Sequence, residues 1–326
     1  VAIYRLSLLL PIWRAPGFWF NTLLSTVLLL AETANLILIY LIGKRLYGER
    51  IAVRVAWVYS LLFIPLLMML GRFDALGLTF LLLALYLTLI RRPLASGAIA
   101  GLGFLVKLWS VIVVPVAFWR EPTWRRRAFL IAVTLLTIIM VALPFVLLNP
   151  ELFASSWTVN LKRSSWETVW ALLEGYTGWG SAGGANRFDP ADAGASQHPS
   201  TLPWLVISAG FALIYLWLWT RRTDWHDDRR AVAFTGLTMN LVILYLKGYS
   251  PQYLVWLLPF VILLLPGLRG ITYALLLSIV NIVEYPLYFS MLRNQPWVLV
   301  CTVLARTGLL ILLAVEYGRM ALSQPI

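Results

Sequence analysis

Long apolar stretches, separated by short clusters of Lys and Arg, recur along nearly the whole chain. A stretch of about 20 apolar residues matches the hydrocarbon thickness of a bilayer and exceeds what a helix in a soluble core needs. Inside lipid every backbone N–H and C=O must be paired within the protein, so the spans are helices or a closed barrel. The stretches are continuously apolar rather than alternating, which excludes the barrel. The pattern predicts an all-α, polytopic transmembrane helical bundle.

Composition excludes several other classes of protein. Of 326 residues, 61% are hydrophobic and 12% are charged, a balance that no soluble domain needs. The formal net charge of +12 is distributed between the spans rather than gathered in one patch, so we expect no nucleic-acid partner. Cys301 is the only cysteine, which excludes an intrachain disulfide and a cysteine-based metal site. We expect no cofactor and no metal.

The apolar stretches and the basic clusters together predict a topology. The predicted spans lie near residues 17–42, 51–70, 74–90, 128–148, 203–220, 231–246, 251–267, 270–291 and 297–317. Assigning the basic clusters to the cytoplasm places the turns at 71–75 and 247–253, and the loop at 149–202, on the outer face. We expect a single transmembrane domain over 1–326, with 149–202 as a long extracytoplasmic loop, in the plasma or inner cell membrane and in contact with its lipids.

One apolar stretch, residues 93–119, conflicts with a simple crossing. Arg91–Arg92 precede it and Arg120 follows it, and the charge rule assigns both flanks to the cytoplasm. A broken, re-entrant helix pair keeps both flanks on one side. Glycines in the first arm allow close helix approach, and Lys107 would lie near the turn. The alternative is an ordinary span that breaks the charge rule.

Polar groups at membrane depth are costly and are candidates for function. Asp74, which follows Arg72 at the outer end of a span, could bind a sugar hydroxyl or accept its proton. The other interpretation of Asp74 is a helix cap with a local Arg72 contact. Lys107 is a cation in an apolar stretch, where an anionic phosphate would explain it. A structural pair with Glu32 would explain it equally well.

A dense polar and aromatic cluster stands where a later span meets the outer surface. Its members are Lys247, Ser250, Gln252, Tyr253 and Trp256. A proline directly after Ser250 fits the first turn of a helix, whose free N–H groups favour anions. The cluster is therefore a candidate cradle for a phosphate or a sugar. The alternative is an interfacial aromatic belt with a helix cap.

The first half of the long outer loop, residues 151–175, has helical composition and many aromatic residues. Within it, Arg163 suits phosphate, and Glu167 suits sugar hydroxyls, while nearby Trp166 offers a flat face for sugar C–H groups. The alternative is a solvated amphipathic helix.

Two further ionic residues lie at matched depth on neighbouring antiparallel spans. The rise of 1.5 Å per residue places Glu284 and Arg306 at similar distances below the outer surface. We interpret them as a salt bridge that holds the two helices in register.

Several motifs together resemble those of a known enzyme family. They are Gly71-Arg-Phe-Asp-Ala-Leu, then Arg91–Arg92, then Ala98-Ile-Ala-Gly-Leu-Gly-Phe-Leu-Val-Lys107, then Pro115, Arg163 with Trp166-Glu-Thr-Val-Trp-Ala, and Ser250-Pro-Gln-Tyr-Leu-Val-Trp256. Their order and spacing resemble the GT-C-type membrane glycosyltransferases, specifically the bacterial polyprenol-phosphate-mannose-dependent mannosyltransferases. The last motif is also similar to one in the first mannosyltransferase of GPI-anchor synthesis.

The resemblance implies a hexosyltransferase. Its donor would be a polyprenyl-phosphate sugar, mannose or a similar hexose, and its acceptor a glycan or lipid on the outer face. It implies that Lys107, Lys247 and Arg163 stabilise the phosphate leaving group, and that Asp74 binds or helps deprotonate the acceptor hydroxyl. It also implies that Gln252, Tyr253 and Trp256 shape the donor pocket, and that the anomeric centre inverts in one displacement.

One departure concerns the start of the chain. Enzymes of this type carry their main catalytic acidic residue in a first outer loop, after an initial span, whereas nothing acidic precedes Glu32 here. Residues 1–12 resemble the interfacial helix that follows that loop. We therefore expect a first span and loop, with the main catalytic acid or base, upstream of Val1.

Two other classes of function stay open at this point. A transporter or a lipid flippase also uses broken helices and buried charges, but such proteins carry internal repeats, and none is evident here. A non-catalytic membrane scaffold would not explain Lys107 or the 247–256 cluster.

Overall fold

A computed structural model describes residues 2–10, 17–62, 73–178, 180, 198–221 and 223–322 of the chain. Within these residues the regular structure is helical, and the one extended pairing is an isolated parallel bridge between Trp166 and Gly248. The predicted all-α fold is confirmed. Arg72, the end of the 51–70 span and most of residues 178–200 lie outside the described residues.

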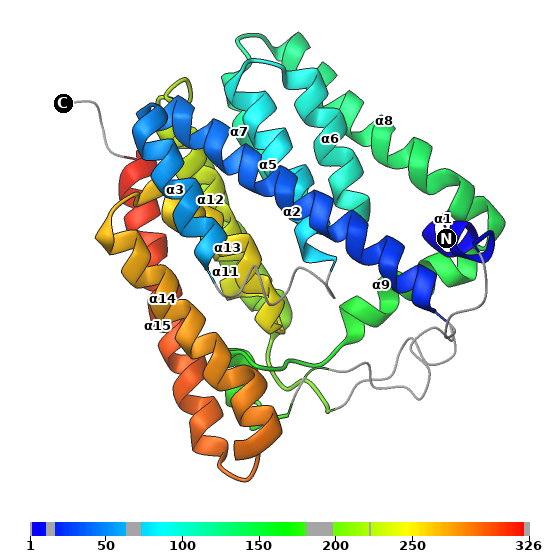
Figure 1. Cartoon of the computed structure of the whole chain (residues 1–326), viewed down its shortest axis with the longest axis vertical. Coiled ribbons are helices and arrows are strands. Elements are labelled where there is room, and N and C mark those ends of the chain that lie inside the picture. Colours follow the sequence, from blue (N-terminus) through cyan, green and yellow to red (C-terminus); the bar gives the residue numbers. More distant parts are fainter. Residues whose placement is uncertain are drawn as a thin grey trace.

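The helices follow the predicted spans closely (Figure 1). In the first half they are α1 (Ala2–Leu8), α2 (Phe18–Tyr47), α3 (Glu49–Leu61), α5 (Asp74–Leu89), α6 (Pro93–Val106), η1 (Leu108–Val113), α7 (Val114–Arg120) and α8 (Trp124–Leu148). In the second half they are α9 (Pro150–Lys162), α10 (Val169–Leu173), α11 (Trp204–Trp219), α12 (Asp228–Tyr245), η3 (Pro251–Tyr253), α13 (Leu254–Leu264), α14 (Leu268–Ile282), the π-helical segment η4 (Val283–Leu292) and α15 (Pro296–Leu322). Four helical segments in the described part are long and apolar enough to cross a membrane, namely α2, α8, α14 with η4, and α15.

Local signals explain where two of these helices depart from the predicted ends. α2 continues to Tyr47, because Lys44 and Arg45 in its last turn suit the negative end of the helix dipole. It then ends at Gly48, whose φ of +82° few other residues adopt. α8 begins earlier than predicted, because the Thr123 hydroxyl accepts a hydrogen bond from a backbone N–H of its first turn.

The predicted break in residues 93–119 is present. α6 ends at Val106, Lys107 is extended with φ −161° and ψ 135°, and a 3₁₀ helix and α7 follow. Arg91, before the first arm, contacts His226 at 2.8 Å, and Arg120, after the second arm, donates to the Trp225 carbonyl at 3.0 Å. Both flanks therefore lie at one end of the molecule, as the re-entrant interpretation requires (Figure 1).

Glycines permit the close packing of this broken pair. A Cβ on Gly103 would lie 2.3 Å from the Ser110 Oγ and 2.5 Å from the Phe80 Cβ, so the returning arm and α5 both use the space that a side chain would occupy. A Cβ on Gly97 would lie 2.8 Å from the Thr134 Oγ1, which brings α6 directly against α8. The small-residue face of α6 thus contacts both neighbours.

The centre of the bundle and its periphery differ in burial. Every residue of α13 is buried, and α12 is buried over most of its length. By contrast α8 is strongly apolar yet largely exposed, with Met140 73% and Leu147 73% exposed. An apolar helix that presents such side chains outward is typical of a lipid-facing surface.

Candidate functional site

Asp74 and Lys107, distant in sequence, form an ion pair at the start of α5. The same Asp74 oxygen, Oδ1, accepts a hydrogen bond from the Trp256 indole N–H at 2.6 Å. The Lys107 ammonium lies 4.6 Å from the centre of the Tyr253 ring and 5.7 Å from the Trp256 ring. Trp109 packs against both rings. We call these five residues the Asp74–Lys107 cluster.

Local structure in three elements positions the cluster. Asp74 opens α5, where a carboxylate is favoured by the free N–H groups of the first turn. Lys107 stands at the break between α6 and η1, and Trp256 projects from the buried α13. Gly77 allows them to meet, because a Cβ there would lie 2.6 Å from the Trp256 ring and 3.4 Å from the Lys107 Cβ.

The two charged groups differ in accessibility. The Asp74 side chain is 3% exposed, whereas the Lys107 side chain is 23% exposed. A buried carboxylate needs paired donors to offset its lost hydration, and here an ammonium and an indole N–H provide them. Lys107 is therefore the more exposed member of the pair.

Glu32, the other partner considered for Lys107, is occupied elsewhere. Its carboxylate accepts from the Asn35 amide at 3.0 Å, and the same amide donates to the Ala75 carbonyl at 3.0 Å. Asn35 thus ties α2 to the first turn of α5. Lys107 contacts Asp74 instead. Asp74 is therefore an ion-pair partner as well as a residue of the first turn of α5.

The long loop is fixed to the 247–249 turn by backbone contacts. The Trp166 N–H donates to the Lys247 carbonyl at 3.2 Å, and the Tyr249 N–H donates to the Trp166 carbonyl at 3.0 Å. The Thr168 hydroxyl also donates to the Lys247 carbonyl, at 2.8 Å. A Cβ on Gly248 would lie 2.2 Å from the Trp166 ring, so only glycine admits this contact.

This attachment brings the loop residues toward the Asp74–Lys107 cluster. The phenol of Tyr253 lies within the electrostatic reach of Asp74, Arg163 and Glu167, and the backbone N–H of Tyr253 donates to the Ser250 carbonyl at 2.8 Å. The Arg163 guanidinium stacks 3.9 Å from the centre of the Trp166 ring. Tyr253 therefore joins the loop residues to the cluster.

Glu167 is held in an unusual backbone conformation and is buried. Its φ is +52°, and its side chain carries a buried oxygen, Oε2, without a hydrogen-bond partner among the described residues. Burial, and then the nearby carboxylate of Glu284, raises the pKa of the Glu167 carboxyl well above its ordinary value. A protonated Glu167 can donate a hydrogen bond toward Glu284, which relieves the repulsion of two carboxylates near one arginine.

The predicted Glu284–Arg306 salt bridge is confirmed. Arg306 does more than hold α15 to the preceding helix, because its guanidinium also donates to the Glu167 backbone carbonyl and stacks 3.7 Å from the Tyr249 ring centre. The Tyr249 hydroxyl in turn donates to Asn281 at 3.0 Å. The pair thus links the two last helices to the long loop.

Other residues selected from the sequence are placed around this site. Lys247 points toward the end of α9, where its ammonium donates to the Leu161 carbonyl at 3.0 Å and lies 5.1 Å from the Trp204 ring centre. Burial lowers the pKa of Lys247. Ser250 and Gln252 are half-buried in the turn that begins η3. Arg72 lies outside the described residues.

Sequence reasoning missed two contributions. Nothing in the sequence indicated a role for Trp109 except that it lies two positions after Lys107. Glu174 closes the loop: its carboxylate accepts from the Ser165 and Ser200 hydroxyls and from the Thr201 and Leu202 N–H groups. These hydrogen bonds lower the pKa of Glu174 in spite of its partial burial. A lone glutamate before a Gly-rich segment could not be identified as an anchor.

A cluster of three or more His, Cys, Asp or Glu side chains that could hold a metal ion is absent from the described part of the chain. The arrangement instead offers an ammonium beside a carboxylate, bordered by aromatic rings and approached by an arginine. Such a set can bind a phosphate group and hold a hydroxyl next to it.

Comparisons with known proteins give one match. No curated protein and no solved structure matches the chain significantly. The sequence model of glycosyltransferase family 87 matches residues 3–246, which is most of the chain and includes Asp74, Lys107 and the loop segment 163–168. This match favours the glycosyltransferase interpretation over the transporter and the scaffold. The chain belongs to glycosyltransferase family 87.

Proposed function

We propose that this glycosyltransferase transfers a hexose, mannose by resemblance, from a polyprenyl-phosphate donor to a glycan or lipid acceptor on the extracytoplasmic face of the cell membrane. The observation that carries the proposal is the Asp74–Lys107 cluster. It combines a partly exposed lysine, a buried carboxylate and three aromatic rings at the break of a helix pair. A lipid-linked phosphosugar presents the matching groups: an anionic phosphate, an apolar tail and a sugar ring.

In this proposal Lys107 stabilises the leaving phosphate. Its ammonium contacts Asp74 and carries three N–H donors. A phosphodiester that approaches the exposed side of Lys107 would accept an N–H hydrogen bond, and negative charge that develops on the leaving oxygen would strengthen that hydrogen bond. Arg163, close to Tyr253, would add a second cation on the loop side.

Asp74 would act on the acceptor when the donor has engaged Lys107. A phosphate that draws the ammonium away leaves the Asp74 carboxylate with the Trp256 N–H and a free acceptor oxygen. The acceptor hydroxyl then donates its proton to Asp74, while its oxygen bonds to the anomeric carbon and the bond from that carbon to the phosphate oxygen breaks. Polyprenyl phosphate leaves, and the anomeric centre inverts.

The remaining candidate residues would contact the donor or the acceptor and hold it in position. Tyr253 and Trp256 border the ammonium and would contact the donor sugar. Ser250 and Gln252 offer polar groups in the same turn, and Glu167 offers a buried carboxyl to a sugar hydroxyl. Lys247, in contact with α9, would act on the donor from the loop side or hold the loop in place.

The test is sugar transfer from radiolabelled polyprenyl-phosphate-mannose in membranes that contain the full-length protein. We expect labelled glycosidic product, and a loss of about 100-fold or more in rate for Lys107→Gln, as is typical when a donor to a developing oxyanion is removed. Lys107→Arg, which keeps the charge, should retain part of the activity. The matched control is Lys44→Gln, a half-exposed lysine paired with exposed Glu49.

Three outcomes would contradict the proposal. Movement of the labelled donor across the membrane without any glycosidic product would indicate a transporter. Equal rates for Lys107→Gln and Lys44→Gln would remove the phosphate role of Lys107. Transfer from a nucleotide sugar alone would exclude the lipid-linked donor.

A further inference from the structure

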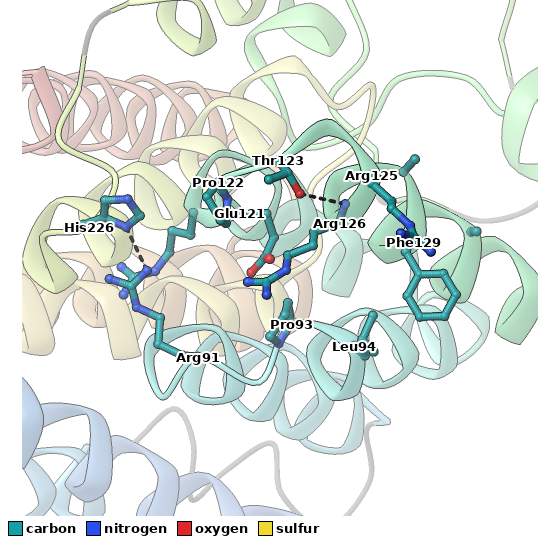
Figure 2. A pocket seen from close by; sticks show the side chains of 13 residues that line it. Arg91, Pro93, Leu94, Glu121, Pro122, Thr123, Arg125, Arg126, Phe129 and His226 are labelled. Atoms are coloured by element: carbon teal, nitrogen blue, oxygen red, sulfur yellow. Dashed lines mark hydrogen bonds between the residues drawn. The ribbon is translucent and has the colours of Figure 1, made fainter.

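A second site lies at the opposite end of α5 from Asp74. α5 has 16 residues, so at 1.5 Å per residue its two ends are about 24 Å apart. Beyond its far end is a cavity of about 1050 Å³, which is lined by the turn before α6, the turn before α8, the first turns of α8, and His226. Figure 2 shows these side chains converging from the two turns. None of them belongs to the Asp74–Lys107 cluster.

The polar side of this cavity is strongly basic. Its lining contains four arginines, Arg91, Arg120, Arg125 and Arg126, and one acid, Glu121. Anions are favoured further by the positive dipole ends of two helices that begin there, α6 and α8. The cavity is therefore suited to a negatively charged group.

The four arginines differ in whether they already bind other groups of the protein. Arg120 is bound to Asp228 and to the Trp225 carbonyl, and Arg91 donates to the His226 Nδ1. Arg125 and Arg126 are exposed, and neither guanidinium has a salt bridge among the described residues. Figure 2 shows both on the α8 side of the cavity. These two are available to an incoming anion.

The other side of the cavity is apolar and continues along α8. Leu94 and Phe129 line it and are 42% and 57% exposed. Leu136, Ile139 and Leu143 follow Phe129 along α8 at helical spacing and are about half exposed as well. A free phosphate ion would gain nothing from contact with such an apolar surface, whereas an acyl chain would pack against it.

We propose that this cavity binds an anionic phospholipid of the cytoplasmic leaflet. Its phosphate lies between Arg125 and Arg126 at the start of α8, and one acyl chain runs along Phe129 and the apolar face below it. Glu121 can accept a hydrogen bond from a headgroup hydroxyl. Basic pockets between membrane helices on this side of the bilayer are suited to such headgroups. The bound lipid would join the ends of the broken helix pair to α8.

The test measures lipid retention by the purified full-length protein. Phosphatidylglycerol or phosphatidylcholine is added in detergent, and bound lipid is counted by native mass spectrometry. We expect retention of phosphatidylglycerol over phosphatidylcholine, and a reduction of about tenfold or more in its affinity for Arg125→Gln/Arg126→Gln. The charge-preserving Arg125→Lys/Arg126→Lys variant should retain most of the binding.

The matched control is Arg50→Gln/Arg54→Gln, which removes two exposed arginines of α3 from outside the cavity. Thermal unfolding without anionic lipid checks that each variant is folded. Equal retention of the two lipids, or an equal loss in the α3 variant, would overturn the proposal. Competition by glycerol phosphate that is as effective as competition by the lipid would also overturn it, since the site would then bind a phosphate headgroup without any contribution from the acyl chains.

Discussion

At the scale of single residues, the site depends on one carboxylate oxygen. Oδ1 of Asp74 receives both the Lys107 ammonium and the Trp256 indole N–H. A carboxylate that is 3% exposed would be unstable without such donors, because it has lost its hydration. The two donors differ in burial, since Trp256 is fully buried in α13 whereas the Lys107 side chain is 23% exposed. In the proposed reaction Trp256 would hold Asp74 when Lys107 turns to the donor phosphate.

This leads to a prediction for Trp256→Phe, which keeps the aromatic packing and removes the N–H. We expect a loss of about 1–3 kcal/mol in stability, the usual cost of leaving a buried acceptor without its donor. Trp297→Phe is the control, because Trp297 is 63% exposed. The two variants are compared by thermal unfolding in detergent. If both unfold at the wild-type temperature, the indole hydrogen bond does not stabilise the carboxylate.

The sequence was enough to select Asp74 and Lys107 as site residues, but it did not predict that they contact each other. Charged side chains in apolar stretches pointed to Asp74 and Lys107 because such groups are costly in lipid. The sequence left open whether Lys107 meets a phosphate or Glu32. Its contact with Asp74 depends on Gly77, which lets the Trp256 ring and Lys107 reach α5. Such a three-element contact has no signature in any one segment.

At the scale of elements, the broken helix pair is the feature that the charge pattern predicted. Two basic flanks around one apolar stretch require a return, and the return occurs at Lys107. The attachment of the long loop to the 247–249 turn could not be predicted, because it consists mainly of backbone hydrogen bonds. Any sequence can form such bonds, and only Gly248 marks the place where the Trp166 ring needs space.

The broken pair itself gives a prediction for Gly103→Ala. The added methyl would meet the Ser110 Oγ and the Phe80 Cβ well inside normal contact distance, so the returning arm must shift. We expect about 1–3 kcal/mol of destabilisation, as for other overpacked cores, and a larger loss of sugar transfer because Lys107 moves with the arm. Gly308→Ala is the control, since a Cβ there meets nothing within 4 Å.

Thermal unfolding and the transfer assay are measured on both variants. Helix propensity alone would make alanine the more stable residue at each position by about 1 kcal/mol. A Gly103→Ala variant that is as stable and as active as Gly308→Ala would therefore contradict the tight packing of the two arms.

At the scale of the whole molecule, polar contacts connect parts that are distant in sequence. Arg306 on α15 joins Glu284 to the backbone of Glu167 in the long loop. At the other end, Arg45 of α2 and Arg120 of α7 both bind Asp228 of α12. The first end thus has an ionic link that joins the last helices to the long loop, and the other end has links that join the first half of the chain to the second. Breaking the buried Glu284–Arg306 pair would leave an uncompensated charge, so this pair favours one arrangement of the helices that it joins.

The proposed topology predicts which side of the membrane each end faces. Arg92 and Arg125 are exposed on either side of the α6–α7 pair, and Glu151 is exposed at the start of α9. In a Cys301→Ser background, we expect cysteines at positions 92 and 125 to react with an impermeant maleimide only after the cells are permeabilised. A cysteine at 151 should react in intact cells, because α8 separates it from 125 by one crossing. An ordinary span over 93–119 would instead place 92 and 125 on opposite sides, and opposite labelling of these two positions would exclude the re-entrant pair in the membrane.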